Sequence, residues 1–342
     1  MEANINKKIV RSIDLGYGFT KFIQNVTDKG DVKPVSFPSV ASIAGKKNLG
    51  GGFFAERDTI TVKHEGVFFE VGKDALLAAG GYGNRPLNRD YTSSNDYAVL
   101  MKGALKMMNL TSIDNLILGA PVNNYSQVKK SLKTAWEGII ELDDERKIKI
   151  NKVTVLPQPL GGFNWHIKNL GTGAYEKLKQ QRSLIIDPGH FTFDWLVTQN
   201  MKMLEGSNSH EGGMSFVIKE IANEVCNGAN DLTVLSRIDE YFYNDKPFMF
   251  KGKEVDLSKH LKVANTVISK SVQSMLNSLG NTNNVNNIDN IIMIGGAAEI
   301  YLPHVQKIFE GRDVHISKGK SFANVMGFQW IGEAISNGKR MG

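Results

Sequence analysis

The stretch IDLGYGFTKF, residues 13–22, recurs in form as IIDPGHFTFD, residues 185–194. In each copy an apolar run ends in an aspartate, and a glycine turn leads into a second alternating run, which predicts two strands joined tightly. The aspartates, Asp14 and Asp187, lie 173 residues apart, about half the chain. This spacing fits a duplicated domain better than a shorter solenoid repeat. Two like domains facing each other would place the two aspartates across one cleft, where a metal–phosphate ligand could bind.

The composition is that of a folded protein. The chain has 342 residues, of which 41% are hydrophobic and 22% charged, as is ordinary for globular proteins and unlike disordered ones. At roughly 100–200 residues per domain, this length predicts about two domains. The 41 basic and 35 acidic residues give a net charge of +6, spread in short groups rather than in blocks. Because no recognition helix is evident either, we expect no direct DNA binding.

Other classes of protein are excluded by the same sequence. No stretch approaches the roughly 18 uninterrupted apolar residues that cross a bilayer. The first residues lack the apolar core of a signal peptide, so we expect a cytoplasmic protein without a membrane partner. Cys226 is the single cysteine, which rules out an intrachain disulfide and a Cys-only metal site.

The remaining pattern alternates strands with helices and predicts an α/β protein. A Gly/Lys-rich stretch at 44–54 predicts a surface loop, and the stretch 153–163 predicts a strand that breaks at two prolines and two glycines. Further strands are predicted over 30–45, 60–72, 115–121 and 291–294. Helices are predicted from Ser94 onward and over 125–138, 215–226, 258–279 and the tail from Ser321.

Three short elements carry residues suited to binding phosphate and metal. At the first turn, Gly16 and Gly18 allow backbone amides to approach an anion, and Lys21 can reach a phosphate oxygen. The aspartates of the two turns can hold the hydration shell of Mg²⁺, which binds through few protein ligands plus substrate phosphates. The third element is a strand that runs into Gly295 and Gly296 at a helix start, where a nucleotide can lie against bare backbone.

In this order and spacing, the three elements resemble the phosphate-1, phosphate-2 and adenosine motifs of the actin/Hsp70/sugar-kinase superfamily. The segments LPQPLGG, residues 156–162, and ANVMG, residues 323–327, are similar to its two connecting segments. The resemblance therefore spans residues from about 10 to 335. The compact length, the proline-rich first connection and residues 88–105 look like bacterial plasmid-segregation actins of the ParM (StbA) type.

The resemblance implies an actin-like fold, in which two similar ribonuclease-H-like domains flank a nucleotide cleft. Domain I would comprise residues 1–162, with a C-terminal helix over 327–342 returning to it, and domain II would comprise residues 163–326. The implied ligands are ATP, or GTP, and Mg²⁺.

The resemblance also implies a role for each site residue. Asp14 and Asp187 would bind Mg²⁺ through water, and the catalytic residues would be Asp187 and Gln158. Gln158 would orient the attacking water, since an amide cannot act as a base. Tyr17 and His190 are unusual at their positions, and plasmid actins often carry Glu where Gln158 stands. The residues expected to bind nucleotide are Asp14, Gly16, Tyr17, Gly18, Phe19, Lys21, Gly189, His190, Phe191, Thr192, Gly295, Gly296 and Ala297.

Two functions follow from this resemblance. In the first, the protein is a filament-forming ATPase whose subunits add head to tail, and the filament moves plasmid DNA through a DNA-binding adaptor protein. The alternative is a non-polymerising kinase or chaperone-like ATPase of the same superfamily. A scaffold that has lost hydrolysis also fits, because Gln158 can only position water.

Overall fold

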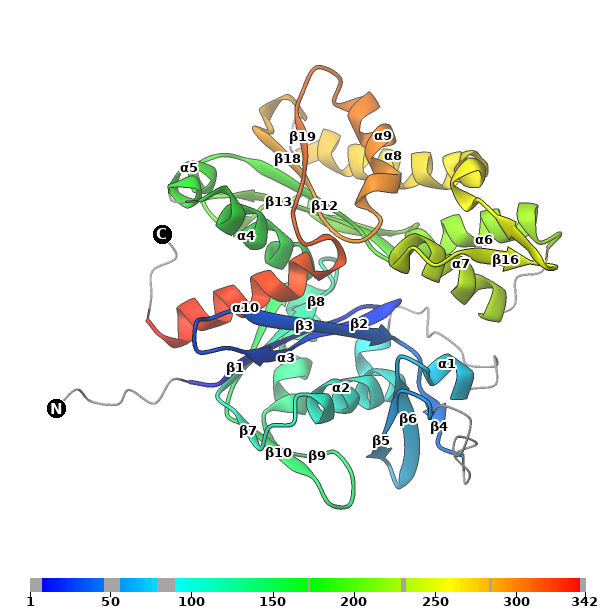
Figure 1. The fold of residues 1–342 in the computed structure, drawn as a ribbon. Coiled ribbons are helices and arrows are strands. Elements are labelled where there is room, and N and C mark those ends of the chain that lie inside the picture. Colours follow the sequence, from blue (N-terminus) through cyan, green and yellow to red (C-terminus); the bar gives the residue numbers. More distant parts are fainter. Residues whose placement is uncertain are drawn as a thin grey trace.

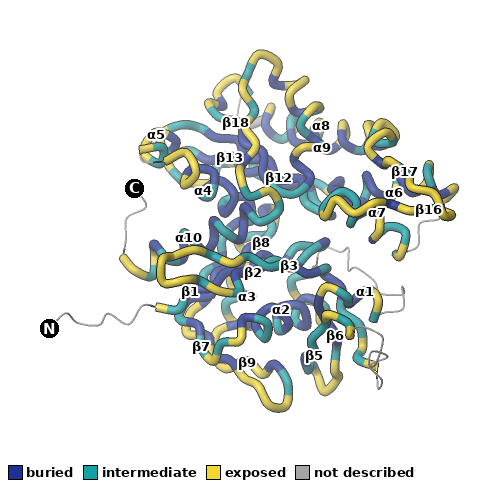
Figure 2. Tube along the Cα trace, viewed as in Figure 1, coloured by how far each residue is buried: buried dark blue, intermediate teal, exposed yellow. Residues whose placement is uncertain are grey.

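The computed structural model describes residues 8–45, 56–78, 90–171, 173–228, 232–282 and 285–338. Two α/β lobes lie one above the other, with two helices between them (Figure 1). The buried residues run through the central strands of both lobes, and the exposed residues lie on the outer loops (Figure 2). Most of the predicted loop at 44–54 lies outside the described residues.

The first lobe is built on a sheet with the strand order β11-β8-β1-β2-β3. Strand β1 pairs antiparallel with β2 and parallel with β8, which pairs parallel with β11. The strands are β1 (Val10–Leu15), β2 (Phe19–Val26), β3 (Val32–Pro38), β8 (Asn115–Ala120) and β11 (Val153–Pro157). Its main helices are α2 (Asn95–Met107) and α3 (Tyr125–Trp136). As predicted, α2 begins after Ser94, whose side chain accepts a hydrogen bond from the Tyr97 amide.

Smaller elements complete the first lobe. Two small three-stranded sheets have the orders β4-β6-β5 and β7-β10-β9. The elements are β4 (Ser42–Ile43), β5 (Thr59–His64), β6 (Val67–Gly72), α1 (Ala75–Ala78), η1 (Tyr91–Ser93), β7 (Ser112–Ile113), β9 (Gly138–Glu141) and β10 (Lys147–Ile150).

The second lobe repeats the plan of the first. Strand β12 pairs antiparallel with β13 and parallel with β18, which pairs parallel with β19, while β13 also pairs with β14 and β15. The strands are β12 (Ser183–Pro188), β13 (Thr192–Gln199), β14 (Lys202–Met203), β15 (Asn208–Glu211), β18 (Asn290–Met293) and β19 (Val314–Ile316). The order β2-β1-β8-β11 thus corresponds to β13-β12-β18-β19, as expected for a duplicated domain.

Helices and a small hairpin surround the second sheet. The elements are α5 (Ala174–Gln180), α6 (Met214–Val225), α7 (Leu232–Asn244), β16 (Phe248–Phe250), β17 (Lys253–Val255), η2 (Leu257–Ala264), α8 (Asn265–Thr282), η3 (Val285–Asn287), α9 (Ala298–Ile308) and η4 (Lys320–Phe322). The helix predicted over 258–279 is divided between η2 and α8, and α7 was not predicted at all. No helix of the described residues is long and apolar enough to span a bilayer.

Helices α4 (Gln158–Leu170) and α10 (Ala323–Ser336) lie between the lobes (Figure 1). Phe328 of α10 packs against strands of the first sheet, and Phe163 and Ile167 of α4 pack against strands of the second. The sequence predicted only a broken strand where α4 forms. Its proline is tolerated because Pro159 occupies the first turn, where no intrahelical partner for the amide is needed.

The two helices approach closely through glycines. A Cβ at Gly327 would overlap the carbonyl of Gly161, and a Cβ at Gly161 would overlap the carbonyl of Asn324. Because α4 contacts α10 as well as the second sheet, it links the two lobes. The predicted boundary between residues 162 and 163 falls inside this helix, so the domain division stays a prediction.

The glycine contact predicts a large effect of one methyl group. Gly327→Ala forces α4 and α10 apart and should destabilise the protein by about 1–3 kcal/mol, the usual cost of overpacking. Gly280→Ala is the matched control, since this helical glycine has open space around it, and alanine should be neutral or slightly stabilising there. Urea denaturation followed by circular dichroism measures both variants. Equal midpoints would show that the helices do not depend on this contact.

Candidate functional site

The two predicted turns have the same backbone structure. In the β1–β2 hairpin the amide of Gly16 donates to the carbonyl of Phe19 at 3.2 Å. In the β12–β13 hairpin the amide of Gly189 donates to the carbonyl of Thr192 at 2.8 Å. The tips face each other between the lobes, and both line one small cavity. The sequence repeat therefore builds a pair of matched turns across a single cleft.

The hairpins differ in charge at one position. Asp14 pairs across its hairpin with Lys21, whose Nζ lies 3.7 Å from Oδ2 of the aspartate. At the equivalent place in the second hairpin, Asp187 pairs with Asp194. The first carboxylate therefore has a cation beside it, whereas the second faces another buried carboxylate.

This arrangement raises the pKa of both carboxyl groups in the second hairpin. Burial raises the pKa of Asp187 to about 7, and Asp194 and Asp14 add to the effect, although a hydrogen bond from Asn324 opposes it. Burial likewise raises the pKa of Asp194 to about 6, against a 2.5 Å hydrogen bond donated by Thr192 Oγ1. A cation bound between the hairpins would relieve both shifts.

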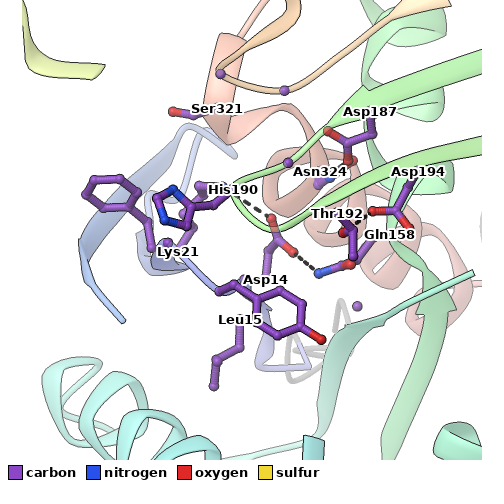
Figure 3. A pocket seen from close by; sticks show the side chains of 18 of the residues that line it. Asp14, Leu15, Lys21, Gln158, Asp187, His190, Thr192, Asp194, Ser321 and Asn324 are labelled. Atoms are coloured by element: carbon purple, nitrogen blue, oxygen red, sulfur yellow. Dashed lines mark hydrogen bonds and ion pairs between the residues drawn. The ribbon is translucent and has the colours of Figure 1, made fainter. Parts of the chain in front are cut away.

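Helices α4 and α10 contribute two amide side chains to the cleft. Gln158, the first residue of α4, donates through Nε2 to Oδ1 of Asp14 at 3.0 Å. Asn324, in the first turn of α10, donates through Nδ2 to Oδ2 of Asp187 at 2.7 Å and accepts the amide of Gly162 at 2.9 Å. Figure 3 shows Gln158 beside Asp14, and Asn324 beside Asp187. Each aspartate is thus oriented by one helix start.

The third predicted element lies beside the second hairpin. Gly295 has φ +86°, and a Cβ there would overlap the Asp187 carboxylate. Gly296 lies beneath the ring of Tyr243, and Ala297 is buried at the start of α9. Only glycine fits at both positions, which explains the Gly-Gly pair in the sequence.

Thirteen of the fifteen predicted site residues line the cavity between the hairpins, which measures about 60 Å³. The other two are Phe191, whose ring packs against Tyr17 and Phe216, and Ala297. Their predicted contact with a nucleotide stays a prediction. A larger cavity of about 980 Å³ adjoins Gly296 and is lined by α7, η2 and α9.

The structure adds lining residues that the sequence analysis did not assign to the site. Asn324 lies in the segment ANVMG, residues 323–327, which is similar to the second connecting segment of the superfamily, so its position carried a signal. Tyr243 lies on α7, whose apolar residues Leu235, Ile238 and Phe242 recur at helical spacing, a signal from which this helix could have been predicted. The lining residues not predicted are Leu15, Tyr91, Thr92, Gly119, Pro121, Pro188, Asp194, Tyr243, Ser321 and Asn324.

The donor set fits Mg²⁺ held partly by other ligands. The described residues contain no cluster of three or more His, Cys, Asp or Glu that could hold a metal on its own. Carboxylate oxygens do converge here, and Oδ1 of buried Asp194 has no hydrogen-bond partner. Mg²⁺ ordinarily keeps several waters and completes its shell with phosphate oxygens. Such an ion fits a site that offers carboxylates but no complete cage.

Comparison with known proteins places this geometry in a family. Residues 12–161 match the family model "Actin like proteins N terminal domain", and residues 185–307 match "Archaeal actin homologue MreB-like, C-terminal". The chain belongs to the actin-like ATPase superfamily. Together the two family models span most of the chain. The search of curated proteins found no match.

Solved structures confirm the predicted actin-like fold. The archaeal actin homologue Ta0583 is similar with a TM-score of 0.73 and 21% identity, over 96% of this chain and 99% of that one. A 15-stranded ParM filament from Clostridium botulinum gives a TM-score of 0.70 and 23% identity, over 96% and 99%. The apo ParM protein of psk41 gives 0.65 and 18%, over 97% and 99%.

The raised pKa of Asp187 predicts how stability depends on pH. The carboxyl has an ordinary pKa of 3.8 and a folded pKa of about 7, so the folded protein binds more protons between these values. Stability therefore falls as the pH rises through this interval. Asp187→Asn removes that loss, so its free energy of unfolding at pH 8 should exceed that of the wild type by about 1 kcal/mol or more.

Urea denaturation in EDTA, without nucleotide, measures this difference at several pH values. The two proteins should converge as the pH approaches 4. Asp313→Asn, which removes an exposed carboxylate, is the control and should follow the wild type. A wild type that is more stable than Asp187→Asn at pH 8 would contradict the assigned burial effect.

Proposed function

We propose that the protein binds and hydrolyses a nucleoside triphosphate between its two lobes, and that its subunits assemble into filaments that segregate plasmid DNA. The observation that carries the catalytic part is the meeting of two matched Asp-bearing hairpins with Gln158 directed at Asp14. The superfamily and the ParM filament among the similar structures support the assembly part.

The hairpin backbones would bind the phosphates. Amides at residues 16–19 and 189–192 lie at the two tips, and Lys21 provides the cation of the first hairpin. Helices α4 and α10 also have their N-terminal ends at the cleft, and the dipole of a helix favours negative charge at that end. The site therefore combines the features that stabilise phosphate.

Asp14 and Asp187 would hold Mg²⁺ through water, and the ion would neutralise charge on the phosphates during transfer. The carboxylates themselves are fixed by Gln158 and Asn324. Gln158 donates its Nε2 to Asp14, which leaves its Oε1 to accept a hydrogen bond from a water. Positioning of this kind is most of what hydrolysis requires of the protein.

ATP is the nucleotide that we propose, since the similar archaeal actin homologue Ta0583 was also solved in complex with ADP. The large cavity beyond Gly296 has room for a base, since small-molecule sites usually measure about 300–1,000 Å³. GTP fits the same phosphate site, so base choice depends on this cavity.

Plasmid movement would need a DNA-binding adaptor. The positive charge of the chain is weak and dispersed, so DNA would be gripped through another protein. Filaments grow when a head-to-tail contact does not close into a ring. We place this activity in the cytoplasm. A non-polymerising kinase or chaperone-like ATPase is the alternative.

Removing the Gln158 amide should slow hydrolysis. We expect Gln158→Ala to reduce single-turnover ATP cleavage by roughly 100-fold, because water positioning is lost, with a much smaller change in nucleotide affinity. Rapid-quench phosphate release measures the step. Gln273→Ala, an exposed glutamine of α8, is the control. An unchanged rate in Gln158→Ala would remove the role assigned to Gln158.

Assembly is tested by right-angle light scattering of the purified protein after addition of ATP and Mg²⁺. We expect a lag, a rise, and a later fall that follows phosphate release, with ADP as the negative control and GTP as the test of base choice. Phosphate release with flat scattering across protein concentrations would favour the kinase or chaperone-like alternative.

A further inference from the structure

Two side chains of α7 reach the cleft from the same face of the helix. Asp239 and Tyr243 are four residues apart, so they lie one above the other, one turn apart. Helix α7 belongs to the second lobe, yet both side chains act on the hairpin of the first lobe, Tyr243 directly and Asp239 through His190.

Tyr243 makes a direct contact between the lobes. Its ring centroid lies 5.0 Å from that of Phe19, at the tip of the first hairpin, with the planes tilted by 50°. The same ring covers Gly296, where a Cβ would overlap it. Tyr243 therefore lies over the backbone at which the small and large cavities meet.

Asp239 acts through His190. The carboxylate is 1% exposed, and its Oδ1 lies 3.6 Å from Nδ1 of His190, whose side chain is 8% exposed. The imidazole is pressed against Gly18, where a Cβ would be 2.6 Å from its Cγ. The pair thus holds the tip of the second hairpin against the tip of the first.

The start of α6 holds the tip of the second hairpin in place. Its carbonyls at Gly189 and His190 accept the amides of Met214 and Ser215, at 2.9 and 2.7 Å, from the start of α6. Opening of the cleft therefore requires the two tips to separate and the Phe19–Tyr243 contact to break.

The sizes of the two cavities also indicate that Tyr243 lies on the path of a bound ligand. The space among the phosphate-binding groups is about 60 Å³, far below the roughly 300–1,000 Å³ of small-molecule sites, whereas the space beyond Gly296 is about 980 Å³. A ligand that reaches from the large cavity to the hairpins must pass Gly296, which Tyr243 covers.

We propose that Tyr243 and Asp239 form a clasp that closes the cleft over a bound nucleoside triphosphate and sets how fast it exchanges. This inference rests on the proposed nucleotide site. Tyr243 would close over the ligand where its base and phosphates join, and Asp239 would keep His190 in place at the tips. These two residues are positioning residues, and hydrolysis chemistry stays with the hairpins.

The test is the dissociation rate of a fluorescent N-methylanthraniloyl ATP, followed by stopped flow after a chase with excess ATP. Tyr243→Ala and Phe19→Ala should each release it about fivefold to tenfold faster, since each removes the aromatic contact. The double variant should be no faster than the faster single variant, because both changes remove one interaction. Asp239→Asn should also accelerate release.

Controls separate the clasp from general damage. Tyr175→Ala, which changes a half-buried tyrosine of α5 outside the cleft, should release nucleotide at the wild-type rate. If Tyr243→Ala fails to fold by circular dichroism, Phe19→Ala tests the same contact from the other lobe.

The outcomes distinguish the two proposals. A wild-type protein that binds no nucleotide overturns the proposed function. Binding by the wild type with unchanged release in Tyr243→Ala, or with independent effects of the Phe19 and Tyr243 changes, overturns the aromatic contact as a clasp. Unchanged release in Asp239→Asn overturns the part assigned to the His190–Asp239 pair.

Discussion

The close approach of α4 and α10 is the constraint on which the rest of the structure depends. These helices touch backbone to backbone at Gly161 and Gly327, and each also covers one sheet. Their starts are thereby fixed at the cleft, with Gln158 on Asp14 and Asn324 on Asp187. The glycine contact that joins the lobes is thus the same feature that orients the two carboxylates, so stability and site geometry cannot be separated here.

The cleft has two turns of the same shape but different electrostatics. Lys21 stands beside Asp14, whereas Asp194 stands beside Asp187 at the equivalent position. The first hairpin can therefore attract phosphate, while the second gathers negative charge that a cation would relieve. The proposed Mg²⁺–phosphate ligand would suit this cleft, since it carries both an anion and a cation.

Local signals explain how much of this could be predicted. The hairpins follow from alternating runs and glycines that lie next to each other in sequence, and their repetition predicted the paired lobes and most lining residues. Helix α4 was missed because Pro159, Gly161 and Gly162 are helix breakers in isolation, and only their burial against Asn324 and Ile294 makes glycine an advantage. Helix α7 was missed although its apolar residues recur at helical spacing. Its contacts could not be predicted, because no sequence pattern reports which side chain will cross a cleft.

The residues that sequence reasoning found unusual are those that cross between the lobes. Tyr17 contacts Phe191, and His190 contacts Gly18, so aromatic rings at the hairpin tips fill the space between the lobes. Larger side chains at hairpin tips bring the lobes into direct contact and leave little space among the phosphate-binding groups. A nucleotide bound as proposed would therefore compete with contacts that the protein makes with itself. That competition would couple occupancy of the cleft to the relative position of the lobes, as the proposed nucleotide-controlled assembly requires.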